Sequence, residues 1–535
     1  MTSTKNPPVK KQLSSSGSHT ISLCLFSLCA AISTWFADAD PAANPEQLNP
    51  TQLQAYLLMG GAGIAQAQAV PAADQTTLLK RCWIINKQGR WESAKVSAGE
   101  LPTIGTDTQS WSGPALDFAQ EMLKQKPKVQ IGLIFNAQPD TNIEDCCGIK
   151  TPAYRFSRKY SRIAIKQGTL KGMLWQGSGA ISPLFTDLDH LENLISNIRT
   201  DLRLLELPFV AGETLGKKSA NTQLHALTQD VHATAVAPTG SGGAGYAKAM
   251  LQLEKEWPDN LPTPKPTVPV IDPHIHAMAA KPGGLDIVAE WMKRNDVERC
   301  ITSPLGQSRA TTLEERKIML ENHRKYRGKI DRFCLIKPDE VATLEEAVKI
   351  LKQEKTEGAV GFGEHYGHDL MFDDPKNVLL YQACGKVGLP VMFHIDASKN
   401  MVKQGMRRVE RVLEICPDTK IIAHAYWWLH LPNGTCERML SKYPNLYADV
   451  SGTRMVSVLN RDRNYSRKLL TQYQDRILFA TDAGWWSFSK PIKERELQFE
   501  LFERLGLRGE IKEKIYRKNA MTLFGWKPQI ESPKE

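Results

Sequence analysis

Short apolar runs alternate with amphipathic segments, such as 405–417, throughout the second half of the chain. Eight strand–helix units in about 260 residues predict a closed parallel (β/α)8 TIM barrel. An open doubly wound sheet is the alternative, and the placement of polar residues at the strand ends favours the barrel. The eight apolar runs are 268–272, 297–303, 331–336, 359–363, 390–395, 420–425, 446–450 and 477–481.

The first half of the chain has the same mixed pattern in a less regular form, which predicts a second α/β domain. Helical patterns at 113–125 and 191–203 lie between the predicted strands. These strands are 55–59, 129–135, 172–175 and 207–211.

Two segments rich in proline, 40–50 and 258–267, are typical of linkers. They divide the chain into a first domain at 51–257 and a second at 268–528.

Residues 1–39 precede both domains. There, lysines are followed by an apolar run at 21–37 and by the small residues Ala37-Asp38-Ala39, which is the order of a secretory signal peptide. We therefore expect an exported protein, periplasmic or extracellular. An uncleaved membrane anchor is the alternative, although the run is short for one.

The composition of the chain limits the classes of binding partner that we expect. Of its 535 residues, 41% are hydrophobic and 24% are charged, which is ordinary for a globular protein. The net charge of +10 comes from lysines and arginines interleaved with acidic residues, so we expect no nucleic-acid binding. The ten cysteines show no CxxC spacing that would indicate structural zinc. A small-molecule substrate is the expected partner.

Residues that can bind or serve a metal ion stand at the ends of five predicted barrel strands. Active sites of barrels form at this carboxyl end of the strands. A single histidine at a strand end is usually a packed residue. Here, however, candidate ligands stand at five strand ends, and chance alone would have to place all of them there. The residues are His274 and His276 on the first strand, Glu364 on the fourth, His394 on the fifth, His424 on the sixth and Asp482 on the eighth.

Imidazole and carboxylate ligands suit zinc or another borderline divalent ion with one position open for water. Such an ion lowers the pKa of water to about 7 and so supplies a nucleophile at neutral pH. A nearby base must then move protons between water, substrate and leaving group.

With these motifs the second domain resembles the amidohydrolase superfamily, in its amidohydrolase-2 branch of hydrolases and decarboxylases. The resemblance implies that His274, His276, His394 and Asp482 bind the metal. It further implies that His424 polarises the scissile group or positions the water, and that Asp482 takes the proton of the water. The matching stretches are PVIDPHIH (269–276), GFGEH (361–365), LPVMFHID (389–396), IIAHAYWW (421–428), ILFATDAGW (477–485) and KNAMTLFGW (518–526).

The role of Glu364 stays open at this point. It could bridge a second metal, bind the first weakly or support another ligand; we expect one ion, with two as the alternative. Four tryptophans follow the catalytic strands and form either pocket walls or buried packing. They are Trp427, Trp428, Trp485 and Trp486.

The first domain resembles the sialic-acid-specific acetylesterase and acetylxylan esterase family, which implies a flavodoxin-like SGNH fold. The matching stretches are GPALDFAQEML (113–123), IGLIFNAQPDTNIED (131–145), GTLKGMLWQGSGA (168–180) and LRLLELPFVAGE (202–213). Its catalytic blocks depart from the family pattern. Ala62 stands where the nucleophilic serine belongs, Pro139 replaces a donor of the glycine-rich turn, and glycines and small residues at 240–245 replace the Asp–His pair. We therefore interpret this domain as a degenerate esterase. The alternative is a displaced pair of Ser178 with His190 or His225.

Three functions follow from these patterns. The first is an exported metal-dependent hydrolase that uses activated water on a small ester, lactone or amide, with an inactive companion domain. The second is a metal-dependent decarboxylase on the same barrel. The third is a glycan-binding protein acting through the first domain, whose family resemblance also suggests a carbohydrate-derived substrate.

Overall fold

The computed structural model describes residues 47–61, 64, 77–96, 114–138, 146–177, 186–258, 266–305, 310–367, 370–396, 406–488 and 496–527. The described residues from 48 onward form one compact unit. The predicted signal peptide at 1–39 and most of the predicted linker at 258–267 lie outside the described residues. Among the described helices, none is both long enough and apolar enough to cross a membrane.

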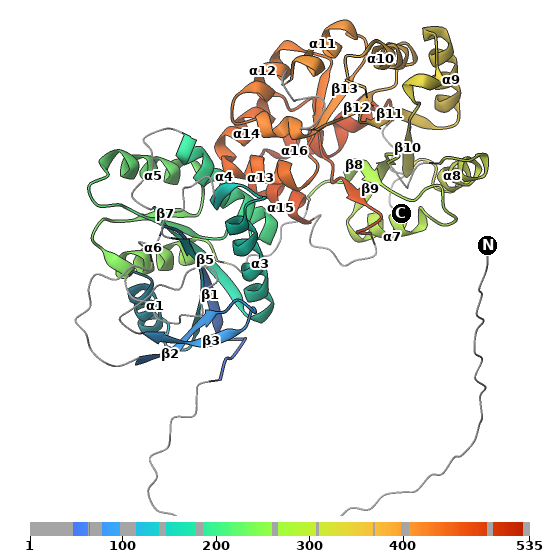
Figure 1. Cartoon of the computed structure of the whole chain (residues 1–535). Helices are drawn as coiled ribbons and strands as arrows, with labels where there is room; N and C mark the ends of the chain where they lie inside the picture. Colours follow the sequence, from blue (N-terminus) through green and yellow to red (C-terminus); the bar gives the residue numbers. More distant parts are fainter. Residues whose placement is uncertain are drawn as a thin grey trace, which may run out of the picture. The chain divides into compact units, whose positions relative to one another are not determined.

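The second half of the chain is a parallel barrel, as predicted (Figure 1). Each strand pairs with the next along the chain, and the eighth strand is split into two pieces. The first piece, β15 (Ile477–Leu478), pairs with β14, and the second, β16 (Ala483–Gly484), pairs with β8 and closes the barrel. The other strands are β8 (Val270–His276), β9 (Val297–Thr302), β10 (Ile330–Cys334), β11 (Ala359–His365), β12 (Val391–Ile395), β13 (Ile421–Ala425) and β14 (Leu446–Asp449).

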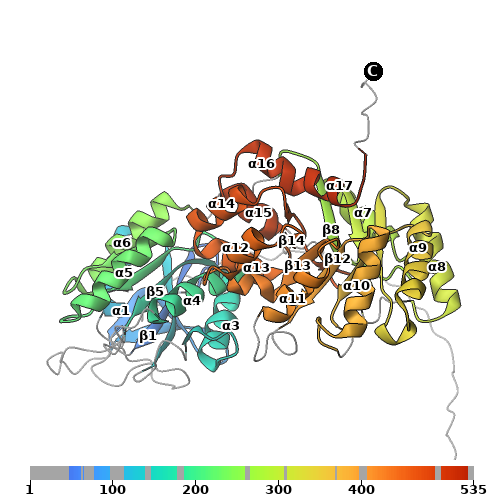
Figure 2. The ribbon, with the colours of Figure 1, turned by 90° about the horizontal axis from the view of Figure 1, so that it is seen from above.

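Helices cover the outside of these strands (Figure 2). Two of them begin with capping boxes, in which Thr312 and Glu315, or Thr343 and Glu346, satisfy the first backbone N–H groups. The helices are α7 (Asp286–Arg294), α8 (Leu313–Lys325), α9 (Leu344–Thr356), α10 (Pro375–Val387), α11 (Arg407–Ile415), α12 (Thr435–Lys442), α13 (Thr453–Arg461), α14 (Arg463–Gln472), α15 (Glu496–Arg504), α16 (Gly509–Glu513) and α17 (Asn519–Leu523).

The first half of the chain forms a seven-stranded sheet in the order β3-β2-β4-β1-β5-β6-β7. Apolar clusters on both of its faces are covered by helices, with α3, α4 and α5 on one face and α1 and α6 on the other. The strands are β1 (Leu53–Gly61), β2 (Thr77–Ile85), β3 (Trp91–Val96), β4 (Gln130–Gln138), β5 (Thr169–Gln176), β6 (Phe209–Gly212) and β7 (Thr234–Ala237). The helices are α1 (Pro114–Gln125), α3 (Pro152–Gln167), α4 (Thr186–Leu202), α5 (Lys218–Asp230) and α6 (Gly242–Glu256).

This sheet is mixed, whereas a flavodoxin-like fold implies a parallel one. Strand β3 runs antiparallel to β2 at the edge, and the other neighbours are parallel. The cause is the short connection between them, since a turn of a few residues can join only antiparallel strands. In that turn the side chain of Asn86 accepts hydrogen bonds from the N–H groups of Gln88 and Arg90, and Gly89 adopts a φ of 78°.

His323, on α8, gives the barrel a dependence on pH that does not involve the strand-end cluster. Its ring lies between the hydroxyl of Thr302 and the carbonyl of Met319, at 3.0 and 2.8 Å, and burial lowers its pKa to about 4. In the unfolded chain the pKa is about 6.5. Between these values only the unfolded state gains a proton, so stability should fall as pH drops from 6.5 to 4, by at most about 3 kcal/mol.

Chemical denaturation at pH 7.5 and pH 5 measures this effect. His323→Gln should show a smaller difference between the two pH values than the unaltered chain. An equal difference in both proteins would contradict the prediction.

Candidate metal centre

Six side chains meet at the carboxyl end of the barrel, and they are the six that the sequence singles out. Their ligand atoms form overlapping groups in which all atoms lie within 4.8 Å of one another. The contributing residues are His274 and His276 of β8, Glu364 of β11, His394 of β12, His424 of β13, and Asp482 between β15 and β16.

Glu364 is the carboxylate at the middle of this cluster, and its two oxygens face different histidines. Oε2 lies 3.3 Å from Nε2 of His276 and 3.7 Å from Nε2 of His274. Oε1 contacts Nδ1 of His394 and lies 3.4 Å from Nε2 of His424. The carboxylate therefore has one oxygen toward each pair of histidines.

Asp482 closes the cluster from the break in the eighth strand. Its Oδ1 lies 3.1 Å from Nε2 of His276, and its Oδ2 lies 3.9 Å from Nε2 of His424. The residue has a φ of 55°, and its N–H donates to the carbonyl of His274. Its side chain is 30% exposed, while those of His274, His276, His424 and Glu364 are 2% exposed or less. Among these residues, solvent therefore reaches Asp482 most readily.

A seventh residue, Asp449 at the end of β14, was missed by the sequence analysis. It is fully buried, and its oxygens lie 2.8 Å from Nδ1 of His274 and 3.1 Å from Nδ1 of His424. Ser451 donates a hydrogen bond to it at 2.8 Å. The signal was available, because Asp449 is a carboxylate at the end of the seventh apolar run, on the same face as the other strand ends.

The charges of the cluster shift the pKa values of its members. Burial alone would raise the pKa of Glu364, but the histidines facing it hold that pKa well below its ordinary value. Burial alone would lower the pKa of His276, but the carboxylates of Asp482 and Glu364 raise it to about 9. For Asp449, the charge of His424 and the hydrogen bonds from both imidazoles outweigh burial and lower the pKa well below its usual range. The cluster therefore strongly favours the ionised forms of Glu364 and Asp449.

The residues present fit a divalent cation. Nε2 of His274 is buried, and no hydrogen bond reaches it from the described residues; Glu364 and Asp482 offer oxygens at 3.7 and 3.8 Å, too far for one. Unsatisfied buried polar atoms are costly, so such an atom indicates a ligand that the protein itself does not supply. Histidine nitrogens with carboxylate oxygens are the donor set that zinc and similar ions prefer.

Aromatic rings flank two of the histidines. Trp486 is 46% exposed and stacks on His276, with ring centroids 6.0 Å apart. Tyr366, which the sequence analysis did not single out, stacks on His394 at 4.0 Å. Trp485 is partly buried and meets His276 edge-on. The interpretation as pocket walls thus fits Trp486.

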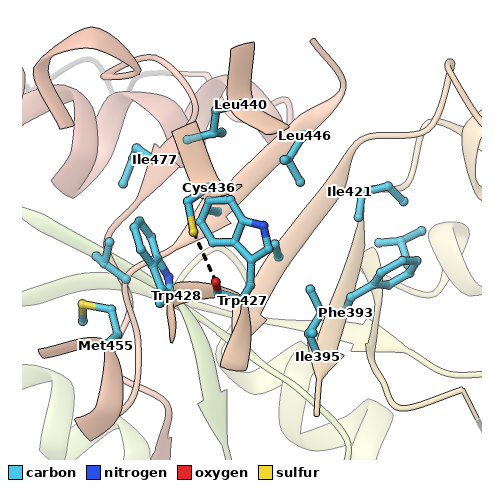
Figure 3. Packing of buried hydrophobic residues seen from close by; sticks show 14 of the residues in the cluster. Phe393, Ile395, Ile421, Trp427, Trp428, Cys436, Leu440, Leu446, Met455 and Ile477 are labelled. Atoms are coloured by element: carbon cyan, nitrogen blue, oxygen red, sulfur yellow. Dashed lines mark hydrogen bonds between the residues drawn. The ribbon is translucent and has the colours of Figure 1, made fainter. Parts of the chain in front are cut away.

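The other two tryptophans do not line a pocket. Trp427 and Trp428 are fully buried and pack against each other and against apolar residues of the barrel wall (Figure 3). The indole N–H of Trp428 donates to the carbonyl of Asp449 at 2.5 Å. Their position after β13 turns both rings into the apolar layer between strands and helices.

Trp428→Ala should therefore cost about 3–5 kcal/mol in the free energy of unfolding, because it removes a large buried ring and leaves a cavity. Trp486→Ala is the matched control and should change stability by less than about 0.5 kcal/mol, since that ring is half exposed. Urea denaturation of both variants makes the comparison, and equal losses would contradict it.

In the first half of the chain, the structure accounts for one of the departures from the esterase pattern. Gly243 lies at the start of α6, where a Cβ atom would come within 2.1 Å of the carbonyl oxygen of Pro114. Glycine there allows α6 to pack closely against α1. His225 pairs with Glu213 at 2.8 Å. Ala62, Pro139 and Ser178 lie outside the described residues, so the displaced-pair alternative stays a prediction.

Comparison with known families shows which family model each half of the chain matches. Residues 307–526 match the amidohydrolase family model. Residues 54–249 match the model of the carbohydrate esterases described as sialic acid-specific acetylesterases. Both resemblances predicted from the sequence are thus confirmed, and the first supports an amidohydrolase-type enzyme. His274 and His276 precede the matched amidohydrolase range, so the barrel structure alone brings them to the site.

Solved structures resemble parts of the chain. 5-Carboxyvanillate decarboxylase from Sphingomonas paucimobilis is 14% identical, with 49% of this chain and 100% of that chain covered and a TM-score of 0.35. Dihydroorotase from Campylobacter jejuni is 14% identical, with 48% and 84% covered and a TM-score of 0.36. A protein from Arabidopsis thaliana is 19% identical, with 39% and 99% covered and a TM-score of 0.30. No curated protein matches the chain.

Proposed function

We propose that the amidohydrolase half is a metal-dependent hydrolase that adds water to a small ester, lactone or amide. The observation that carries this proposal is the convergence of four histidines and two carboxylates, where no described residue forms a hydrogen bond with the buried Nε2 of His274. A divalent cation bound by these groups, most simply zinc, would polarise the scissile carbonyl and lower the pKa of water.

Three residues of the chain would transfer the proton, orient the substrate and pack against it. Asp482 is the most exposed carboxylate of the cluster, so it can accept the proton of the attacking water and return it to the leaving group. His424 is held from behind by Asp449 and presents Nε2 to the centre, where it can orient the substrate carbonyl. The exposed face of Trp486 can pack against the substrate beside His276.

The position of Glu364 supports two ions in place of the single ion expected from the sequence. Each of its oxygens faces a different pair of histidines, which is the arrangement a bridging carboxylate needs. His274 and His276 would hold one ion, and His394 and His424 the other. Metal content per chain, measured on the purified protein, distinguishes the two cases.

Hydrolysis of a panel of lactones, esters and amides tests the proposal. Activity should disappear on chelation, return on addition of zinc, and be absent from His394→Ala. Hydrolysis unaffected by both treatments would contradict metal dependence. Release of carbon dioxide from an aromatic or unsaturated carboxylate, with no hydrolysis, would establish the decarboxylase alternative.

We also propose that the chain is exported and that its first half is a degenerate SGNH-like esterase that retains affinity for carbohydrate. The order of lysines, apolar run and small residues at 1–39 supports export, and the family match at 54–249 with alanine at position 62 supports the degenerate esterase. Zinc-free protein should release no acetate from acetylated sugars. A chelator-resistant acetylesterase activity would contradict it.

A further inference from the structure

The carboxylate of Asp449 contacts two imidazoles of the cluster at once. Its Oδ2 lies 2.8 Å from Nδ1 of His274, and its Oδ1 lies 3.1 Å from Nδ1 of His424. An ionised carboxylate can only accept hydrogen bonds, so each imidazole carries a proton on Nδ1. Nε2 is then the nitrogen of each ring that is left to bind a metal ion in the centre.

The Nε2 atoms of His274 and His424 both face the carboxylate of Glu364. That of His274 lies 3.7 Å from Glu364, and that of His424 lies 3.4 Å from Glu364. The two rings are 4.4 Å apart and nearly perpendicular. One buried carboxylate thus sets which nitrogen of each ring meets the metal centre.

The surroundings of Asp449 hold it in place. Ser451 donates to its Oδ1 at 2.8 Å and lies 2.6 Å from Nδ1 of His424. The indole of Trp428 donates to its backbone carbonyl at 2.5 Å. Its strand, β14, is paired on both sides, with β13 and β15. The carboxylate therefore cannot easily turn away from either imidazole.

We propose that Asp449 is a positioning residue that fixes the tautomer and orientation of His274 and His424 together, with Ser451 as its support. This inference rests on the proposed function, because it concerns the same site. Asp449 acts through the two imidazoles and does not touch the reacting atoms. His276 is independent of it, since its Nδ1–H donates to the carbonyl of Ser303 at 3.0 Å.

Asp449→Asn in the full chain tests the proposal. Asparagine keeps the size of the side chain but turns one acceptor into an N–H donor. One imidazole then loses its acceptor and favours the tautomer with a proton on Nε2. Zinc affinity, measured by competition with a chromophoric chelator, should fall about tenfold to hundredfold. The visible absorption spectrum of the cobalt(II) form should change as well.

Asp331→Asn is the matched control. Asp331 lies on β10 and pairs with Arg299 at 2.5 Å, so its substitution also removes a carboxylate from a barrel strand. Zinc affinity and the cobalt spectrum should stay as in the unaltered chain. If circular dichroism shows that Asp449→Asn does not fold, Ser451→Ala decides the question. This variant keeps the carboxylate and should shift the cobalt spectrum with a smaller loss of affinity.

Two negative results have different meanings. Unaltered zinc affinity and an unaltered cobalt spectrum in the folded variants would overturn the positioning role and leave the proposed function standing. Failure of the unaltered chain to bind either ion would overturn the proposed function and this inference with it.

Discussion

Asp482→Asn should lower the rate of hydrolysis by about three orders of magnitude, within the range of roughly 10²–10⁴ that a general base contributes. Asparagine fits the left-handed backbone at this position as well as aspartate does, so the fold is preserved. The amide keeps an oxygen near His276 but cannot take a proton. The loss should therefore appear mainly in kcat, measured at saturating substrate.

The control for this substitution is Asp286→Asn, which removes an exposed carboxylate that pairs with Lys325 on the outside of the barrel. It should leave kcat unchanged. Metal content of Asp482→Asn, measured alongside, separates loss of the base from loss of the ion. A kcat within tenfold of the unaltered chain would rule out Asp482 as the proton acceptor.

Glu364→Gln should have the second large effect, on both metal content and activity. The amide replaces one carboxylate oxygen with a donor, so one of the two histidine pairs faces an N–H group in place of an acceptor. We expect fewer ions per chain and at least a hundredfold loss of hydrolysis. Elemental analysis after dialysis against dilute zinc measures the first effect.

Glu298→Gln offers a matched control, since Glu298 pairs with Arg517 away from the cluster. It should keep the metal content of the unaltered chain. Full metal content in Glu364→Gln would show that Glu364 is not a ligand. Half of the original content would support a shared bridging position.

The sequence predicted the barrel well because each strand there is an apolar run between two helices. The run 268–272 corresponds to β8, which continues to His276 because the residues that end the apolar pattern are those that face the centre. The first half was harder to predict. Strand β2 mixes Lys80 and Arg81 with apolar residues, β3 (WESAKV) does the same with a glutamate and a lysine, and β7 (TAVA) has one large apolar residue, so none of the three shows a clear apolar run.

The candidate site, like the fold, could be predicted from the sequence only in part. The strand ends led to six side chains that the structure brings together, because the carboxyl ends of parallel strands meet. Asp449 also ends a strand but was not singled out, because only its contacts with His274 and His424 in the structure show its role. Nor could sequence separate Trp428 from Trp486: both follow a catalytic strand, and only the turn after β13 or β16 decides which ring is buried.

The break between β15 and β16 places the activity of the chain in conflict with its stability. Asp482 holds a left-handed conformation that costs a non-glycine residue on the order of 1 kcal/mol. Glycine at this position would relieve this backbone strain and remove the proposed base. Laboratory evolution for thermal tolerance alone is therefore expected to discard this aspartate early, whereas natural selection for turnover must keep it.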